Sequence, residues 1–384
     1  MALNYDLAED QQILRDSVRK FAEGEIKPKA QELDDKEQFS VELTRQMAEM
    51  GLFGMVVSPE YEGQGMDYVS YIIAVEELAR VDGSHAATIA AGNSLGIGPI
   101  YYFGNEEQKK KYLPKLCRGE GMWGFGLTEA NAGSDAGGSK TNAVLDGNEW
   151  VINGSKIFIT NAACELSMGV TVQAVTGKRE DGRPEYSCIL VEHGTKGFEA
   201  KEMHGKLMWR ASNTAELYFE DVRVPAGNLL GKRGDGFHQM LSTLDAGRLS
   251  IGCMGLGCAQ GAYELALNYA QERVQFGKPL VKFQANAFKL ANMAMEIEAA
   301  RNLMYKACWL KDNKRPYAKE AAMAKLYCSE LARRVSNEAV QIHGGYGLMK
   351  EYDVERFYRD AKLLEIGEGT SEIQRLVISR HIGC

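Results

Sequence analysis

A chain of 384 residues is long enough to form two or three domains. Its hydrophobic content of 45% and charged content of 25% are those of an ordinary globular protein, and its net charge of -7 argues against a general nucleic-acid surface. Residues 1–15 lack the basic and apolar segments of a signal peptide, and no apolar run approaches membrane-spanning length. We therefore expect a cytoplasmic protein without membrane insertion.

Cysteine and histidine are scattered along the chain. The eight cysteines include no Cys-x-x-Cys pair, and the six histidines have no metal-ligand spacing. We expect reduced thiols that act mostly as packing groups, and no metal site.

Helical patterns fill the first third of the chain. Apolar residues recur at helical spacing in residues 38–50 and 106–116, whereas residues 68–80 and 86–102 are mostly apolar, as expected of buried helices. The pattern changes near residue 122. We predict an N-terminal helical domain over residues 1–121.

Residues 122–232 have the pattern of short strands. Asp146-Gly147 and Asn153-Gly154 are two-residue turn signals between strand-forming runs, which predicts two hairpins. Further strands are expected at residues 169–175, 187–192 and 216–219, with an exposed hairpin tip at residues 178–183. Because no helix separates these strands, we expect a small antiparallel barrel or sandwich.

The chain is again helical from residue 233 to residue 384. Helices at residues 236–274, 286–311, 316–342 and 371–380 predict a four-helix bundle. The first of them contains several glycines, which weaken a helix and therefore indicate close contact with another backbone or a flat ligand. These are Gly247, Gly252, Gly255, Gly257 and Gly261.

A single carboxylate near the C-terminus stands between two glycines. Gly367 and Gly369 permit unusual backbone angles around Glu368, and the apolar run at residues 363–366 anchors the loop before a helix starts at Ser371. A poorly solvated carboxylate in such a loop has a raised pKa and can accept a proton. The alternative is a glycine-rich helix cap with a solvated glutamate.

Two stretches of the strand region could face a ligand. Residues 126–135 offer hydroxyls and free amides to a phosphate or a heterocycle edge, although a plain loop has the same composition. Phe158 and Thr160 lie two residues apart, so they share one face of a strand and could cover a flat ring and donate to it. The alternative is a core phenylalanine and a surface threonine.

Three features of the helical C-terminal region also have two interpretations. Arg273 suits a pyrophosphate. Residues 341–347 bring three glycines to a helix end, which suits either a nucleotide or a simple cap. Asp245 and Arg248 share one helix face at i, i+3, and such a pair is more often a surface ion pair.

Taken in order, residues 127–135, 341–347 and 367–375 resemble the signatures of the acyl-CoA dehydrogenase family of flavoproteins, especially its short-chain and short-branched-chain members. The resemblance covers the chain end to end. It departs from the family at Ala130-Asn131, where Pro-Gly is usual, and at Phe158, where Trp is frequent. It implies an N-terminal helical domain, a small antiparallel β-barrel and a C-terminal four-helix bundle, usually in a homotetramer.

The resemblance further implies one non-covalent FAD per subunit and an acyl-CoA substrate. Residues matching those that line the flavin ring are Phe125, Leu127, Thr128, Phe158 and Thr160, with Thr370 and Glu372 further along the FAD. Residues matching those that hold the adenylate of FAD, from a neighbouring subunit, are Arg273, Gln284, Gln341, Gly344 and Gly345. Residues matching the substrate site are Asp245, Arg248, Gly369 and Ser134, the last shared with the pyrophosphate of FAD.

Glu368 matches the catalytic base of the family. The resemblance implies that Glu368 accepts the α-proton while the β-hydrogen passes to the flavin as hydride, which gives a trans-2-enoyl-CoA. The backbone N–H of Glu368 and a ribityl hydroxyl of FAD would stabilise the thioester oxygen. Electrons would leave to an electron-transfer flavoprotein. Some relatives carry the base at the position of Gly247, which cannot act as one here.

Two glycines bear on the acyl group. Gly367 stands where Tyr is frequent in relatives and Gly92 where a larger residue is common, which suggests a roomier acyl pocket. Residues 91–95 offer no basic group for a dicarboxylyl substrate. We expect a short or branched acyl-CoA. The alternative is a bulky cyclic or aryl-propenoyl-CoA, reduced as a 2-enoyl-CoA with an electron-bifurcating electron-transfer flavoprotein.

Three further classes have family-like chains. DNA-binding relatives need a basic surface or an added domain, and oxygen-using oxidases are typically much longer. A flavin-free scaffold would be colourless when purified.

Overall fold

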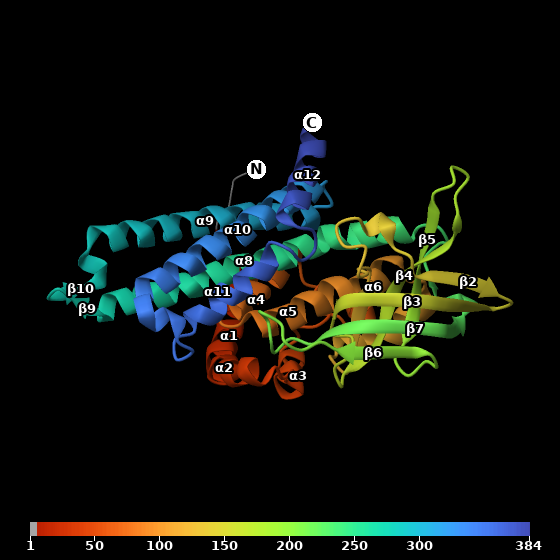
Figure 1. Cartoon of the computed structure of the whole chain (residues 1–384), viewed down its shortest axis with the longest axis horizontal. Coiled ribbons are helices and arrows are strands. Elements are labelled where there is room, and N and C mark those ends of the chain that lie inside the picture. Colours follow the sequence, from red (N-terminus) through yellow and green to blue (C-terminus); the bar gives the residue numbers. More distant parts are fainter. Residues whose placement is uncertain (1–5) are drawn as a thin grey trace.

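The computed structural model describes residues 6–384. Figure 1 shows an elongated molecule, with long helices towards one end, a twisted sheet at the other and the N-terminal helices packed beneath both. None of the helices within the described residues is long and apolar enough to cross a membrane.

Seven α-helices precede the sheet in the described part of the chain. Polar side chains cap several of them: Ser40, Asp67, Asp82 and Asn105 each accept a hydrogen bond from a backbone N–H of the first turn. The helices are α1 (Glu9–Phe21), α2 (Lys27–Lys36), α3 (Val41–Glu49), α4 (Tyr68–Ala79), α5 (Gly83–Ala91), α6 (Gly98–Phe103) and α7 (Glu106–Cys117). The helices predicted at residues 38–50, 68–80 and 106–116 are confirmed as α3, α4 and α7, whereas the one predicted at residues 86–102 is divided into α5, a π-helical stretch at Gly92–Ile97 and α6; α2 was not predicted.

The middle region forms one sheet with the strand order β6-β7-β3-β2-β4-β5-β8, and β1 pairs with β4 beside this path. Most pairings are antiparallel, but β1–β4 and β2–β4 are parallel, so the sheet is mixed rather than purely antiparallel. The strands are β1 (Met122–Gly126), β2 (Asn142–Asp146), β3 (Glu149–Thr160), β4 (Ser167–Lys178), β5 (Pro184–Glu192), β6 (Phe198–Glu202), β7 (Thr214–Pro225) and β8 (Leu229–Leu230).

One of the two predicted tight turns is wrong. Asp146-Gly147 does close the β2–β3 hairpin, with Asp146 opposite Glu149. Asn153-Gly154 instead lies inside β3, which continues to Thr160. Gly154 serves close packing there, because an added Cβ would lie 2.7 Å from the Cα of Thr141. The strand keeps pairing with β7 through a local register shift. The predicted hairpin tip at residues 178–183 is exposed and joins β4 to β5.

The C-terminal bundle consists of three long helices and α11. The helices after the sheet are α8 (Gly236–Glu272), α9 (Gln284–Asp312), α10 (Ala318–His343), α11 (Val354–Leu364) and α12 (Ser371–Ile382), and a short hairpin of β9 (Val274–Gln275) and β10 (Lys278–Pro279) joins α8 to α9. The prediction that the helix starting at Ser371 is the fourth member of the bundle is wrong. α11 packs against both α8 and α10, whereas α12 contacts α10 and projects from the body (Figure 1). The apolar stripe of α12 is partly solvent-exposed, with Leu376 and Ile382 at its surface.

The glycines of α8 bring other backbones into contact with it. An added Cβ at Gly257 or Gly261 would overlap the carbonyl oxygen of Glu76 or Arg80 in α4. One at Gly255 would lie 2.8 Å from the carbonyl oxygen of Cys328 in α10. The predicted close backbone approach is therefore confirmed, and one hydrophobic core runs from the N-terminal helices into the bundle. All eight cysteines are free, and seven are buried.

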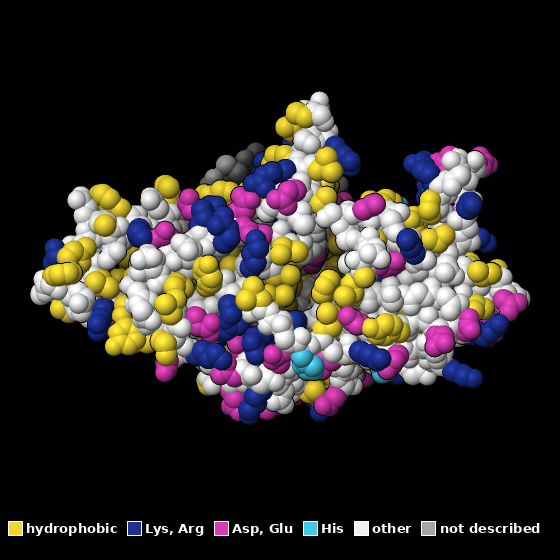
Figure 2. Space-filling view, viewed as in Figure 1, with side chains coloured by type: hydrophobic (Ala, Val, Ile, Leu, Met, Phe, Trp, Pro, Cys, Tyr) yellow, Lys and Arg dark blue, Asp and Glu magenta, His cyan; other side chains and the backbone are white. Residues whose placement is uncertain are grey.

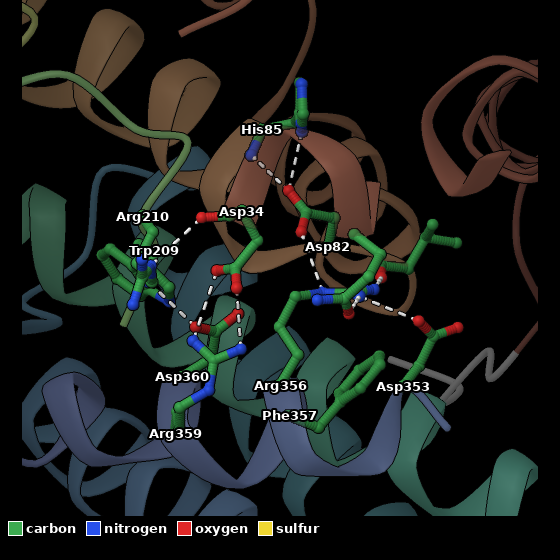
Figure 3. A network of polar contacts seen from close by, with 12 residues as sticks. Asp34, Asp82, His85, Trp209, Arg210, Asp353, Arg356, Phe357, Arg359 and Asp360 are labelled. Carbon is green, nitrogen blue, oxygen red and sulfur yellow. Dashed lines mark hydrogen bonds and ion pairs between the residues drawn. The ribbon is translucent and has the colours of Figure 1, made fainter. Parts of the chain in front are cut away.

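A buried polar junction joins the three regions (Figure 3). Arg359 on α11 forms an ion pair with Asp34 of α2 at 2.8 Å, and Asp360 accepts a hydrogen bond from the backbone N–H of Trp209 at 2.9 Å. Trp209 belongs to the loop between β6 and β7. Gly83 makes the junction possible, because an added Cβ would lie 2.8 Å from Asp360 Oδ2. α11 is thereby fixed to the N-terminal helices and to the sheet.

The substitution Gly261→Ala tests the contact between α8 and α4. We expect it to lower the free energy of unfolding by about 2–3 kcal/mol, because the new methyl group overlaps a backbone carbonyl that cannot move alone. Gly24→Ala is the control, since an added Cβ there has no neighbour within 4 Å. Denaturant unfolding of both variants measures the difference, and equal stability of the two would contradict the packing argument.

Candidate active site

Glu368 lies in the short loop between α11 and α12. The backbone N–H of Ser371 closes this loop by donating to the carbonyl of Glu365 at 2.9 Å. Glu368 and Gly369 both have left-handed backbone angles, with φ of 53° and 96°. Such an angle is strained for a glutamate, so its surroundings must hold it in place.

Part of the expectation for this loop is wrong. Gly367 does not have a positive φ; its lack of a side chain instead accommodates Ile251, whose Cδ1 would lie 3.3 Å from an added Cβ. Leu364 is buried and anchors the loop, but Ile366 is half exposed.

The carboxylate of Glu368 rests against α8 at Gly247, where an added Cβ would overlap its Oε2 atom. That oxygen is buried and has no hydrogen-bond partner among residues 6–384. Burial raises the pKa of Glu368 to about 7, and the positive charges of Lys325 and Arg248 limit the rise. The Glu368 residue as a whole is partly exposed, but its Oε2 atom is shielded, so the alternative of a fully solvated glutamate is wrong. A carboxylate with this pKa can gain and lose a proton near neutral pH.

Two buried side chains form hydrogen bonds with the backbone of residues 365–370, the loop that carries Glu368 and is called the base loop below. The Gln374 amide donates to the carbonyls of Glu368 and Gly369 at 3.1 and 2.9 Å, and Lys325 Nζ donates to the Gly369 carbonyl at 2.7 Å. The sequence analysis identified neither residue. The signal for Lys325 was its place between Ala321 and Cys328 on the apolar face of α10.

Asp245 and Arg248 form an ion pair one turn apart on α8. The pair is not at the surface as a whole, because Arg248 is buried whereas Asp245 is partly exposed. The Nε atom of Arg248 has no hydrogen-bond partner within residues 6–384. This face of α8 therefore presents an unused donor close to Glu368.

Three buried hydroxyl groups, which no sequence pattern predicted, lie near the base. Tyr71 of α4 donates to the Ala90 carbonyl at 2.9 Å and is close enough to Glu368 for the two charges to interact. Ser250 Oγ lies 3.4 Å from Ser94 Oγ. The surroundings of the base are thus polar as well as apolar.

The residues predicted to contact a flavin ring meet at the end of β1 and β3. Phe125 and Leu127 are buried, and the Thr128 carbonyl accepts a hydrogen bond from Ile157 N–H at 2.9 Å. Phe158 has a φ of 63° and is 62% exposed, so the alternative of a core phenylalanine is wrong. Thr160 ends the strand opposite Thr214. An aromatic ring held exposed in a strained backbone fits the cover of a flat cofactor.

A buried ion pair supports this part of the site. Lys156 Nζ lies 2.8 Å from Glu129 Oε1 and donates to the Leu127 carbonyl at 3.1 Å. Glu129 also accepts hydrogen bonds from the backbone N–H groups of Lys140 and Thr141. These contacts fix the first residues of the loop 127–135, whereas Ser134, later in the loop, is exposed.

A second candidate cofactor region lies at the opposite end of the bundle. An open hollow of about 480 Å³ is lined by Arg273, Gly344 and Gly345 together with Tyr269 and Tyr346. The Arg273 guanidinium lies 5.4 Å from the centre of the Tyr346 ring. An arginine, exposed backbone and aromatic rings fit a nucleotide. The other residues predicted for this region, Gln284 and Gln341, are exposed at the ends of α9 and α10 but do not line the hollow.

The two candidate cofactor regions are separated within one chain. α8 starts against the sheet, where Gly236 contacts Ser187, and ends at Glu272 beside the hollow. A helix of 37 residues is about 55 Å long, much longer than an extended dinucleotide. Thr370 caps α12 between these two regions, and Glu372 follows it. In Figure 1 the β9–β10 hairpin and the sheet lie at opposite ends of the molecule.

The two glycines expected to enlarge the acyl pocket both lie close to neighbouring side chains. An added Cβ at Gly92 would lie 2.9 Å from Phe53 Cε1, and one at Gly367 would lie 3.3 Å from Ile251 Cδ1. A larger residue at Gly92 would therefore require Phe53 to move, and a roomier acyl pocket stays a prediction. Within residues 6–384 no group of three or more His, Cys, Asp or Glu residues is placed to hold a metal ion.

The three family models of acyl-CoA dehydrogenases match this chain along most of its length. The N-terminal domain model matches residues 8–120, the middle domain model residues 124–222 and the C-terminal domain model residues 234–383.

Curated relatives match end to end. The chain is 52% identical to the probable acyl-CoA dehydrogenase YngJ of Bacillus subtilis, over 99% of this chain and 100% of that protein. It is 47% identical to the short-chain specific acyl-CoA dehydrogenase of Clostridium acetobutylicum, with the same coverage. It is 44% identical to the acryloyl-CoA reductase (NADH) of Anaerotignum propionicum, over 99% of this chain and 96% of that protein.

Solved structures match equally completely. A chain from work on the electron transferring flavoprotein of Acidaminococcus fermentans, directed towards flavin-based electron bifurcation, has a TM-score of 0.96 at 44% identity, covering 99% of this chain and 100% of that one. Butyryl-CoA dehydrogenase from Megasphaera elsdenii has a TM-score of 0.95 at 42% identity, with the same coverage. A glutaryl-CoA dehydrogenase from Mycobacterium smegmatis in complex with FADH2 has a TM-score of 0.93 at 32% identity, covering 98% of this chain and 95% of that one.

The substitution Glu368→Gln tests the burial of the carboxylate. Because the folded-state pKa of about 7 lies above that of an unfolded glutamate, the wild type should lose stability relative to the variant as pH rises from about 4.5 to 7, by about 3 kcal/mol. Urea unfolding at pH 5 and pH 8 measures this difference. Glu180→Gln, in the exposed turn between β4 and β5, is the control and should show a pH-independent difference. Identical pH dependence of the two variants would mean that Glu368 is solvated.

Proposed function

Because the chain belongs to the acyl-CoA dehydrogenase family of FAD-dependent oxidoreductases, we propose that it removes the α- and β-hydrogens of a short or branched acyl-CoA, with Glu368 as the base. The observation that carries the proposal is the buried, unpartnered Oε2 atom of Glu368, whose pKa is raised to about 7 by burial. Because no protein group donates to this oxygen within residues 6–384, it is free to accept a proton from a substrate.

The chemistry requires a base, a donor to the thioester oxygen and a hydride acceptor. Glu368 accepts the α-proton on its buried Oε2 atom, and its side chain becomes a neutral carboxylic acid. The backbone N–H of Glu368, for which no acceptor is found among residues 6–384, donates to the thioester oxygen as negative charge develops there. FAD, when bound, supplies the acceptor for the β-hydrogen. The product is a trans-2-enoyl-CoA.

The sheet and α12 would orient the cofactor. Phe125, Leu127 and Thr128 form the wall for the flavin, with Phe158 and Thr160 at its edge, and Ser134, Thr370 and Glu372 lie along the rest of the FAD. Asp245 and Arg248 would bind the CoA part of the substrate. Arg248 supports this role because its Nε atom is unused.

A short acyl group is compatible with the packing around the base and is supported by two relatives. Phe53 and Ile251 lie beside Gly92 and Gly367, and the Tyr71 ring is buried close by. Two of the relatives are named for short acyl groups, one as short-chain specific and one as a butyryl-CoA dehydrogenase.

We further propose that a second copy completes the cofactor site. The hollow at Arg273 lies about 38 Å along α8 from Gly247, where the Glu368 carboxylate rests, so a FAD whose flavin lies beside Glu368 would take its adenylate contacts from a neighbouring chain. Apolar side chains gather at the hollow end of the molecule (Figure 2), where Phe276, Leu348 and Met349 are exposed. A homotetramer would cover them.

The proposed electron acceptor is an electron-transfer flavoprotein. The A. fermentans structure supports this partner, because that work concerns an electron transferring flavoprotein. A second function is favoured by the relative named acryloyl-CoA reductase: the same site would reduce a 2-enoyl-CoA, with a bifurcating electron-transfer flavoprotein as donor. Glu368 would then give its proton to the α-carbon.

The substitution Glu368→Gln tests the base directly. We expect turnover to fall by about 10²–10⁴-fold, because no other group takes the α-proton, whereas FAD content and acyl-CoA binding stay unchanged. Dye-coupled turnover, the visible spectrum and acyl-CoA titration measure the three quantities. Gln38→Glu, at the exposed entrance to α3, is a charge-altering control that should leave turnover unchanged. Near-normal turnover of Glu368→Gln would refute the assignment.

An anaerobic titration with acyl-CoA compounds tests the substrate class. Butyryl- and 2-methylbutyryl-CoA should bleach the visible flavin band, whereas cyclohexanecarboxyl- and phenylpropanoyl-CoA should not, if the substrate is a short acyl-CoA as for the relatives named for short acyl groups. Bleaching only by the ring-bearing compounds would contradict the short-chain proposal. Reoxidation of the reduced protein by crotonyl-CoA, without bleaching by any saturated compound, would favour the reductase.

A further inference from the structure

Lys325 is one of the most deeply buried charged residues of the chain. It lies in the middle of α10, and its side chain is fully shielded from solvent. Gly252 of α8 packs directly on its backbone, because an added Cβ there would lie 3.0 Å from Lys325 Cα. The side chain therefore extends within the protein rather than towards water.

The ammonium group of Lys325 has no carboxylate within ion-pair distance in the described part of the chain. Its hydrogen bond is the one to the Gly369 carbonyl, at 2.7 Å. Burying a lysine in this way is unfavourable, and burial lowers the pKa of Lys325 to about 8. A residue that costs stability and forms no ion pair is a candidate for a functional role.

The hydrogen bond of Lys325 ends on the residue that follows the base. Gly369 and Glu368 are the two loop residues with left-handed backbone angles. Gln374 holds both of their carbonyls from α12, and Lys325 holds the second from α10. The strained conformation is thus fixed from two helices at once.

The other charged and titratable groups around Glu368 have partners of their own. On α8, Arg248 pairs with Asp245; on α4, the Tyr71 hydroxyl donates to a carbonyl. Glu365 in the same loop pairs with Arg333 and Lys362, and Glu372 at the start of α12 is exposed. Within residues 6–384, Glu368, whose Oε2 atom is buried, and the fully buried Lys325 are therefore left without a partner of opposite charge in direct contact.

We propose that Lys325 is a positioning residue for Glu368: its ammonium group holds the base loop through the Gly369 carbonyl and, near neutral pH, supplies a positive charge that keeps the Glu368 carboxylate able to ionise. The inference rests on the proposed function only in taking Glu368 as the base. Without the charge, burial alone would act on the carboxylate, and Glu368 would remain protonated to higher pH.

A double-mutant cycle tests this without any substrate. Urea unfolding is measured from pH 4.5 to 9 for the FAD-loaded wild type, Glu368→Gln, Lys325→Met and the double variant. In the wild-type background, the stability difference caused by Glu368→Gln should level off near pH 7. In the Lys325→Met background it should continue to change for about one further pH unit. The same pH window in both backgrounds would overturn the proposal.

The pH profile of kcat/KM gives a second reading, with butyryl-CoA as substrate and a soluble dye as electron acceptor. Lys325→Met should move the acidic limb of the kcat/KM profile to higher pH by about one pH unit. At pH values below the pKa of the base, kcat/KM should therefore fall about tenfold. Lys325→Arg keeps the charge and should return the limb towards its wild-type position. A purely structural role would lower kcat/KM at every pH and leave the limb in place, which would overturn the charge part of the proposal.

Lys206→Met is the matched control. Lys206 is also largely buried, burial lowers its pKa to about 8, and its Nζ bonds to the Ser212 carbonyl and to Thr214 Oγ1. Removal of the Lys206 side chain should leave the acidic limb of the kcat/KM profile in place. It should also leave unchanged the pH range over which Glu368→Gln alters the free energy of unfolding. If Lys325→Met does not fold, Lys325→Gln replaces it. Full turnover of Glu368→Gln would instead refute the proposed function itself, so the two failures are distinguishable.

Discussion

The close contact of α8 with α4, α10 and the base loop is the constraint on which the rest of the molecule depends. Glycines let the backbone of α8 touch neighbouring backbones, which joins the N-terminal helices and the bundle in a single core. One of them, Gly247, leaves space for the Glu368 carboxylate. The packing that stabilises the fold is therefore also the packing that removes water from the candidate base.

The polar junction at α11 connects this packed helical region to the sheet. Asp360 accepts from Trp209, and the loop that contains Trp209 leads into β7, whose first residue, Thr214, pairs with Thr160. In the other direction, α11 leads directly to Glu368. One junction thus connects the end of β3 at Thr160 with the loop that carries Glu368, and Figure 3 shows that its charged residues come from α2, from the turn before α5, from the loop between β6 and β7 and from the region of α11. Burial raises the pKa of Asp360 to about 7, so this connection also contains a titratable group.

Periodicity and turn chemistry predicted most elements because those signals are local. The helices, the Asp146-Gly147 hairpin and the glycine contacts of α8 follow from neighbouring residues alone. The misses arose from contacts between distant segments. Asn153-Gly154 lies inside a strand because β7 pairs across it. The position of Glu368 was readable, but its depth of burial was set by α8, more than a hundred residues earlier.

The charges around the base account for a property that burial alone would not give. A carboxylate moved out of water without compensation stays protonated well above neutral pH and cannot act as a base there. Lys325 and Arg248 oppose this effect without touching the carboxylate, so the pKa of Glu368 is about 7 while Oε2 stays free. A salt bridge would have ionised the group too, but it would have occupied the oxygen that must accept the proton. In the proposed reaction a pKa near neutrality lets the same group accept a proton in dehydrogenation and return it in reduction. The direction then follows from the electron partner, while the protein supplies a proton carrier that works both ways.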